Sequence, residues 1–278
     1  MLAAGAAAID YLPFDYVPAP AGTNAVLGYY LFGTRSSFHS TLTGTTDEGT
    51  RLQSHIGAVR MTRYEELLGQ PAAVQVILPF GALTEGRIAG FDLNEPVGMF
   101  DPLLTLAFWP INQPQARRWL AIASYTSFPL GQYTPGQALN LGGNRFQHDL
   151  QVGLIQGLPG GFTLDLALDW INYTDNDRAG TGRQTLAQQQ TLELYAWLAY
   201  NLTEGSYLAV GYAGALGGTQ RLDGAINGIK TEFHQVRAAY GHFLTPSFQV
   251  TAQVGRDVEV RGGFKQDLAI TLRVLKVF

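Results

Sequence analysis

The sequence predicts an all-β protein: a transmembrane antiparallel β-barrel of the outer-membrane type, with about 12 strands. Apolar and polar residues alternate with period two over segments of about 10 to 15 residues, which is typical of strands with one apolar face. Short and long connections strictly alternate between these segments, as turns and loops do in outer-membrane barrels. The polar faces carry Thr, Gln, Tyr, Ala and Gly more often than charged residues, which disfavours a sheet facing bulk water.

Composition excludes several other classes of protein. Charged residues make up 14% of the 278 residues, well below the roughly 25% of an ordinary soluble domain. A net charge of −4 disfavours nucleic-acid binding, because phosphate contacts need a basic surface. The chain has no Cys, so disulfides, thiolate zinc sites and cysteine nucleophiles are excluded. No run of about twenty apolar residues predicts a spanning helix.

The chain divides into an N-terminal segment, residues 1–22, and a barrel, residues 23–278. Residues 2–8 are small and apolar and fit either the end of a secretory signal or a cloning remnant. Residues 9–22 are aromatic and contain prolines at positions 13, 18 and 20. Proline disfavours regular structure, so we expect an irregular segment ahead of the first strand.

We expect twelve strands along the rest of the chain, near residues 25–36, 51–64, 72–83, 98–110, 117–130, 145–157, 161–174, 188–202, 205–217, 229–244, 247–258 and 263–278. The last is the clearest, because Leu268, Ile270 and Leu272 share one face while Thr271 and Arg273 share the other. Residues 72–83 and 103–109 are apolar on both faces, so periodicity alone does not set their register.

Alternation alone fits a soluble sandwich or a membrane barrel. Two further features favour the barrel. Aromatic residues lie near segment ends, as in interfacial girdles, although some of them can face inward; they are Trp109, Trp119, Phe162, Trp170, Tyr173, Phe243 and Phe248. The chain also ends within a strand at Phe278, which resembles the terminal aromatic by which outer-membrane barrels are recognised for assembly.

Several segments resemble a known family. They are residues 15–24 (DYVPAPAGTN), 78–81 (LPFG), 140–145 (NLGGNR) and 173–176 (YTDN). In this order and spacing they resemble the bacterial outer-membrane channel family of the MetA pathway of phenol degradation. The resemblance implies a twelve-stranded outer-membrane channel associated with breakdown of aromatic or other hydrophobic compounds. Residues 25–28 are smaller and less polar than is common in the family, so contacts of the N-terminal segment are expected to differ.

If the apolar faces meet lipid, the other faces border the lumen. The resulting pore-lining candidates are Asp149, Asp165, Asp169, Glu193, Tyr195, Trp197, Arg237 and Arg273. Charges of opposite sign on neighbouring strands can simply neutralise each other. These residues therefore fit either a structural wall or a selective lining.

Small residues on the inward faces leave room inside the barrel; they are Ala209, Gly211, Ala213 and Gly241. We hypothesise that residues 9–22 fold into or across this space as a constriction, with Tyr11, Phe14 and Tyr16 lining an apolar path. The alternative is a periplasmic tail that lies against the rim.

Catalytic, cofactor and metal sites are not expected. Ser54 and His55 are adjacent, so their side chains point to opposite faces of a strand, and residues 175–177 (DND) lack the rest of a calcium loop. We therefore expect a monomeric channel for passive uptake of small hydrophobic or aromatic molecules, surrounded by outer-membrane lipids and lipopolysaccharide. The alternatives are a channel for polar solutes such as nucleosides or oligosaccharides, and a lipid-modifying enzyme.

Overall fold

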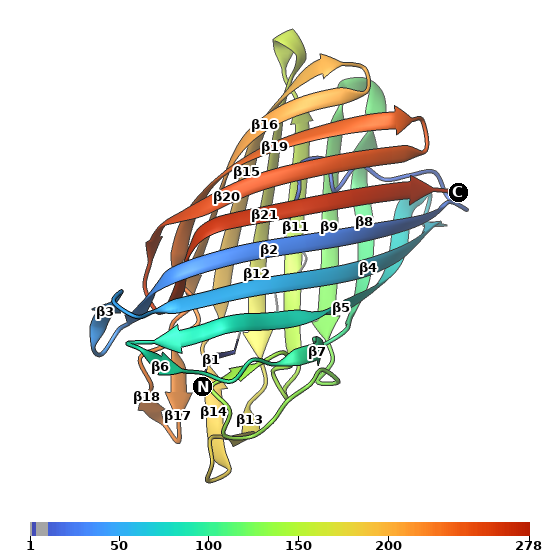
Figure 1. The fold of residues 1–278 in the computed structure, drawn as a ribbon. Coiled ribbons are helices and arrows are strands. Elements are labelled where there is room, and N and C mark those ends of the chain that lie inside the picture. Colours follow the sequence, from blue (N-terminus) through green and yellow to red (C-terminus); the bar gives the residue numbers. More distant parts are fainter. Residues whose placement is uncertain (1, 4–10) are drawn as a thin grey trace.

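The computed structural model describes residues 2–3 and 11–278, and its main feature is a closed antiparallel barrel (Figure 1). Consecutive long strands pair in order, and the last pairs with the first to close the sheet. The wall consists of β2 (Asn24–Ser40), β4 (Arg51–Leu67), β5 (Gln70–Ile88), β8 (Leu103–Gln113), β9 (Arg118–Ser127), β11 (Gln147–Gly157), β12 (Phe162–Tyr173), β15 (Thr191–Thr203), β16 (Ser206–Gly217), β19 (Phe233–Thr245), β20 (Phe248–Val260) and β21 (Gly263–Val277). The predicted fold class is confirmed.

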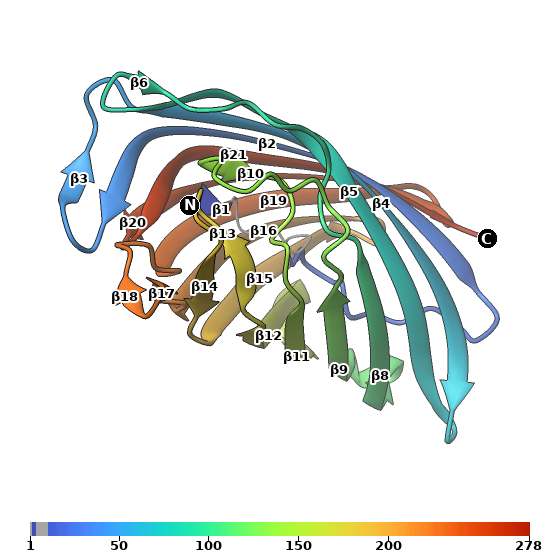
Figure 2. The same cartoon turned by 90° about the horizontal axis from the view of Figure 1, so that it is seen from below.

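Connections at one end of the barrel are tight turns, two of which contain the 3-10 helices η1 (Pro114–Ala116) and η2 (Pro159–Gly161). Loops at the other end are longer and carry short strands (Figure 2). These strands are β3 (Gly44–Thr46), β6 (Phe91–Asp92), β7 (Val97–Met99), β10 (Leu139–Asn140), β13 (Asn176–Ala179), β14 (Gln184–Gln188), β17 (Gln220–Leu222) and β18 (Ala225–Ile226). The predicted strict alternation is wrong at one place, because β20 and β21 meet at the loop end through Arg261 and Gly262 alone.

The two faces of the wall have opposite character. Along β15, Leu192 and Leu194 are 49% and 44% exposed, whereas Tyr195 and Trp197, on the other face, are 6% and 1% exposed. Apolar side chains therefore point away from the barrel and polar or aromatic ones point into it, which is the arrangement of a barrel in lipid. Within residues 2–3 and 11–278, no helix is long and apolar enough to cross a membrane.

The predicted aromatic girdle is only partly present. Trp170, Phe162 and Phe243 are exposed on the outer face. Trp109 is 1% exposed and belongs to the cluster of buried residues inside the barrel, against which Trp119 packs. The position of an aromatic near a strand end thus did not decide which face it occupies.

A short part of the chain ahead of β2 lies inside the barrel. Residues 11–17, called the luminal segment below, pack against the inner wall, and Tyr11, Leu12 and Tyr16 are buried. Further toward the N-terminus, β1 (Leu2–Ala3) pairs in parallel with β10 of a long loop. The prediction for residues 1–22 also covers residues 1 and 4–10, which lie outside the described residues.

Candidate functional site: the lumen

The luminal segment is held in a compact turn. The Asp15 N–H donates to the Leu12 carbonyl at 3.2 Å, and the Val17 N–H donates to the Phe14 carbonyl at 3.1 Å. Pro13 supplies the fixed φ that suits the second position of such a turn. Phe14 follows with φ of 68°, a left-handed conformation that costs a residue with a Cβ about 1–2 kcal/mol. Contacts with the wall must therefore compensate for this backbone strain.

Asp165 of β12 binds the segment through both of its carboxylate oxygens. Its Oδ1 accepts a hydrogen bond from the Tyr11 hydroxyl, and its Oδ2 accepts one from the Phe14 N–H at 2.7 Å. The Asp165 side chain is completely buried. Because both oxygens of one buried side chain bind the same turn, Asp165 is a principal anchor of the strained turn.

A second set of polar contacts holds Tyr16. Its hydroxyl donates to Gln151 Oε1 of β11 and lies 3.2 Å from the Tyr125 hydroxyl. Gln151 Nε2 donates in turn to Asp169 Oδ1 at 2.5 Å. Since an ionised carboxylate only accepts hydrogen bonds, Asp169 orients the amide so that its oxygen faces the phenol.

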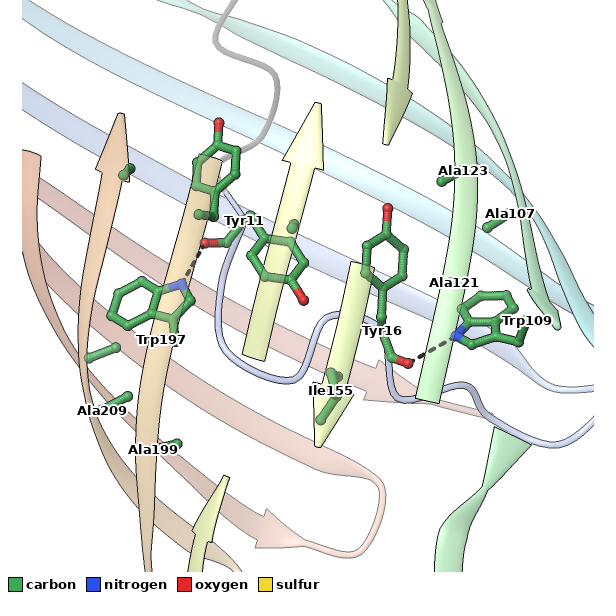
Figure 3. Packing of buried hydrophobic residues seen from close by; sticks show 14 of the residues in the cluster. Tyr11, Tyr16, Ala107, Trp109, Ala121, Ala123, Ile155, Trp197, Ala199 and Ala209 are labelled. Atoms are coloured by element: carbon green, nitrogen blue, oxygen red, sulfur yellow. Dashed lines mark hydrogen bonds between the residues drawn. The ribbon is translucent and has the colours of Figure 1, made fainter. Parts of the chain in front are cut away.

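Two tryptophans bind the backbone of the segment, as Figure 3 shows. Trp197 Nε1 donates to the Tyr11 carbonyl at 3.2 Å, and Trp109 Nε1 donates to the Tyr16 carbonyl at 2.9 Å. Both indoles are 1% exposed. Carbonyl groups that would otherwise be buried without partners are thereby satisfied.

Aromatic contacts fill the space between these polar anchors. The ring centroid of Tyr11 lies 5.6 Å from that of Tyr16 and 5.8 Å from that of Tyr195. Phe14 packs edge-on against Tyr207 at 4.8 Å. These separations are typical of favourable aromatic pairs. The rings thus pack against one another and against the wall of the barrel.

Glycines in the wall make room for aromatic rings. A Cβ added at Gly153 would lie 2.0 Å from Tyr16 Cδ2 of the luminal segment. At Gly211 and Gly241, which were predicted to leave space, a Cβ would instead meet rings of the wall itself, Trp197 at 2.3 Å and Tyr207 at 2.2 Å. Glycine in a strand interior commonly marks such a close approach.

Around the luminal segment, carboxylates and guanidinium groups lie on different arcs of the wall. Asp149, Asp165 and Asp169 project inward from β11 and β12, while Arg60 and Arg273 project inward from β4 and β21. Asp15 of the luminal segment forms an ion pair with Arg273, and both side chains are at most 10% exposed. The segment therefore binds carboxylate on one arc and guanidinium on the other.

A vestibule of about 390 Å³ lies between the luminal segment and the loops. Its charged lining residues include Arg35, Arg145, Glu193, Arg237 and Asp257, and it ends at Tyr195, which packs against Tyr11. A much smaller cavity of about 20 Å³ lies beside Tyr11 and Tyr16, enough for one water molecule.

The loops that border the vestibule are fixed by Asp101. Its two carboxylate oxygens accept hydrogen bonds from the N–H groups of Gly131 and Gly143 at 2.8 and 2.7 Å. Burial raises the pKa of the Asp101 carboxyl, and these backbone bonds act against that shift. Nearby, the Arg145 guanidinium lies 4.7 Å from the centroid of the Tyr173 ring, and burial lowers the pKa of Arg145.

The structure places the predicted lining residues inside the barrel. Seven are buried within it, and Glu193 borders the vestibule; the seven are Asp149, Asp165, Asp169, Tyr195, Trp197, Arg237 and Arg273. Of these, Asp165, Trp197 and Arg273 bind the luminal segment through hydrogen bonds or an ion pair.

Other residues that bind the segment did not emerge from the sequence. Gln151, Tyr125, Trp109 and Gly153 all contact Tyr16. The alternation around Val152 indicates that Gln151 faces inward, and Gly153 in a strand interior is itself a signal of close approach. Neither signal identifies the partner.

Ser54 and His55 lie on opposite faces of the wall, as expected for neighbours in a strand. Ser54 is 4% exposed inside the barrel, whereas His55 on the outer face lies 2.9 Å from the Tyr30 hydroxyl. Within residues 2–3 and 11–278, no three His, Asp or Glu side chains are placed to hold a metal ion.

Comparison with known proteins gives two informative matches. The model of the family described as "Putative MetA-pathway of phenol degradation" matches residues 35–274. The crystal structure of an outer membrane channel from Pseudomonas putida F1 is 28% identical, with a TM-score of 0.90 over 97% of this chain and 100% of that one.

The translocator domain of autotransporter NalP from Neisseria meningitidis is 10% identical, with a TM-score of 0.55 over 94% of this chain and 90% of that one. At this identity the likeness concerns the fold alone. No curated protein sequence matches significantly.

Proposed function

We propose, from the premise that this chain belongs to the family described as putative MetA-pathway of phenol degradation, that it admits small hydrophobic or aromatic molecules by passive diffusion. The family predicted from the sequence is confirmed. The chain is a channel of the bacterial outer membrane, as predicted. The identity of the permeant rests on one observation: the lumen binds aromatic rings in slots that end in hydrogen-bonding groups.

Partition explains why such a lumen favours aromatic solutes. An apolar ring loses little on leaving water and gains contact with Trp109, Tyr195 and the small alanines of the wall. A hydrated ion would have to lose part of its water on passing these rings. Aromatic molecules therefore encounter the lower barrier at this level of the barrel.

We further propose that residues 1–22 act as a plug, separate from the barrel of residues 23–278. Burial of the luminal segment below the vestibule supports this proposal. The turn is anchored by side chains on several strands, among them Asp165, Trp109 and Arg273. Uptake then requires the segment to shift or leave.

A channel for polar solutes remains the second candidate, because the vestibule is lined by Arg35, Arg237, Glu193 and Asp257. Charged side chains on both sides of a passage would bind dipolar or hydroxylated molecules. We propose that the chain works as a monomer in the lipids and lipopolysaccharide of the outer membrane, with a small-molecule permeant and without catalysis.

The test combines deletion with solute transport. Removal of residues 9–20 is expected to raise single-channel conductance, and unchanged conductance would refute the plug. In proteoliposomes, faster entry of phenolic or alkyl-aromatic solutes than of sugars or nucleosides supports the proposed permeant, and the reverse order supports the polar alternative. Release of fatty acid from phospholipid vesicles would contradict a purely non-catalytic role.

A further inference from the structure

We infer that the wall of the lumen contains two binding sites for phenols, which the luminal segment occupies with its own tyrosines. A free phenol of similar size then competes with the segment and promotes its release. This inference rests on the proposed function, because it names the class of permeant and the event that admits it.

The first site holds the Tyr16 ring. Trp109 lies edge-on to this ring, with ring centroids 6.2 Å apart. Gly153 has no side chain, and the Tyr16 ring occupies the space that a Cβ there would fill. Gln151 Oε1 accepts from the hydroxyl and is oriented by the bond from Gln151 Nε2 to Asp169. These groups belong to the barrel, and the luminal segment itself adds only the Tyr11 ring, whose centroid lies 5.6 Å from that of Tyr16.

The second site holds the Tyr11 ring. The Tyr195 ring packs against it in a tilted arrangement, and Asp165 Oδ1 accepts a hydrogen bond from its hydroxyl. Both oxygens of Asp165 take donors from the luminal segment, and the carboxylate is completely buried. If the segment leaves, a buried acceptor loses its partners, which is unfavourable. A free phenol restores one donor, whereas an aromatic hydrocarbon or a phenyl ether restores none.

The luminal segment acts as a tethered ligand, and competition with it determines the concentration at which a free phenol should act. The luminal segment is joined to β2 by residues 18–23, and a short linker gives an effective concentration of the order of millimolar. Phenols should therefore act in the millimolar range. A molecule that resembles the tyrosine side chain, such as 4-methylphenol, is the appropriate probe.

Release of the segment can be measured with one cysteine, because the natural chain has none. Leu12 is 0% exposed in the luminal segment, so a water-soluble maleimide should label the Leu12→Cys full-length chain slowly. We expect 4-methylphenol at about 10 mM to speed labelling on the order of fivefold. The ether 4-methylanisole, with the same ring but no donor, should have little effect.

Leu141→Cys is the matched control, since Leu141 is 1% exposed in a separate cluster beneath the loops. Its labelling rate should not respond to either compound. Equal acceleration by both compounds at Leu12→Cys would overturn the donor requirement. No acceleration by 4-methylphenol, or equal acceleration at Leu141→Cys, would overturn the inference altogether.

The unmodified chain provides a second measurement in case Leu12→Cys fails to fold. Single-channel conductance should rise with 4-methylphenol and stay constant with 4-methylanisole. If deletion of residues 9–20 raises conductance while 4-methylphenol does not, the inference fails and the proposed plug stands. If the deletion itself has no effect, the proposed plug fails.

Discussion

Replacing Gly153 by Ala should release the luminal segment without harming the barrel. The new Cβ would lie 2.0 Å from Tyr16 Cδ2, whereas ordinary contacts begin at 3.4 Å, so the ring must move by about 1.4 Å. A shift of that size breaks the hydrogen bond to Gln151, worth about 1 kcal/mol, and weakens the aromatic contact with Trp109, worth about another 1 kcal/mol. The loss of about 2 kcal/mol changes the ratio of seated to released segment about thirtyfold.

Single-channel recording of Gly153→Ala tests this estimate, with the expectation of a higher probability of the conducting state. Gly182→Ala is the matched control, because no atom lies within 4 Å of its added Cβ, and it should behave as the natural chain. The reasoning would be refuted by a folded Gly153→Ala barrel whose conductance and open probability match those of Gly182→Ala.

Three further changes test other contacts. Asp15→Asn leaves Arg273 without its buried partner and should weaken binding of the luminal segment by about 3 kcal/mol, so that conductance rises. Adding Arg273→Met to Asp15→Asn should recover part of this loss. If the effects of the two substitutions simply add, this expectation is contradicted. Asp101→Ala removes the acceptor of two loop N–H groups at about 2 kcal/mol, so limited proteolysis should cut the loops faster, whereas equal digestion of both proteins would exclude this role. Gly211→Val places a side chain where the Trp197 ring lies and should lower the unfolding temperature. An unchanged unfolding temperature would show that the ring can adopt another position at no cost.

Period-two alternation predicted strands with two different faces, because lipid and lumen select different side chains at every second residue. The uncharged polar faces and the spacing of the connections were needed to favour the barrel. Alternation was ambiguous over residues 72–83 and 103–109 for a physical reason. Inward-facing Ala73 and Ala107 pack in the cluster around the luminal segment, while Val74 and Leu106 are exposed on the outer face. Both faces are therefore apolar where the lumen is filled with protein.

Alternation also predicted which side chains face inward, but not how far along the barrel each one lies. Asp149 and Asp165 are both buried inside, yet of the two only Asp165 hydrogen-bonds the luminal segment. The partners of Tyr16 depend on the depth that Gln151 and Gly153 share, which is fixed by strand register. Trp109 was assigned to the girdle for a different reason, since its position near a strand end did not reveal that its side chain points inward.

The ion pair between Asp15 and Arg273 joins residues 258 positions apart and links the luminal segment to β21, the strand that closes the barrel against β2. Arg273 lies opposite Tyr29 only when β21 is paired with β2. Before these two strands pair, Arg273 is not held in the closed wall to bind Asp15, so we expect the segment to stay accessible to proteases. Resistance of the chain ahead of β2 to proteolysis would therefore indicate that β21 has paired with β2 and the barrel is closed.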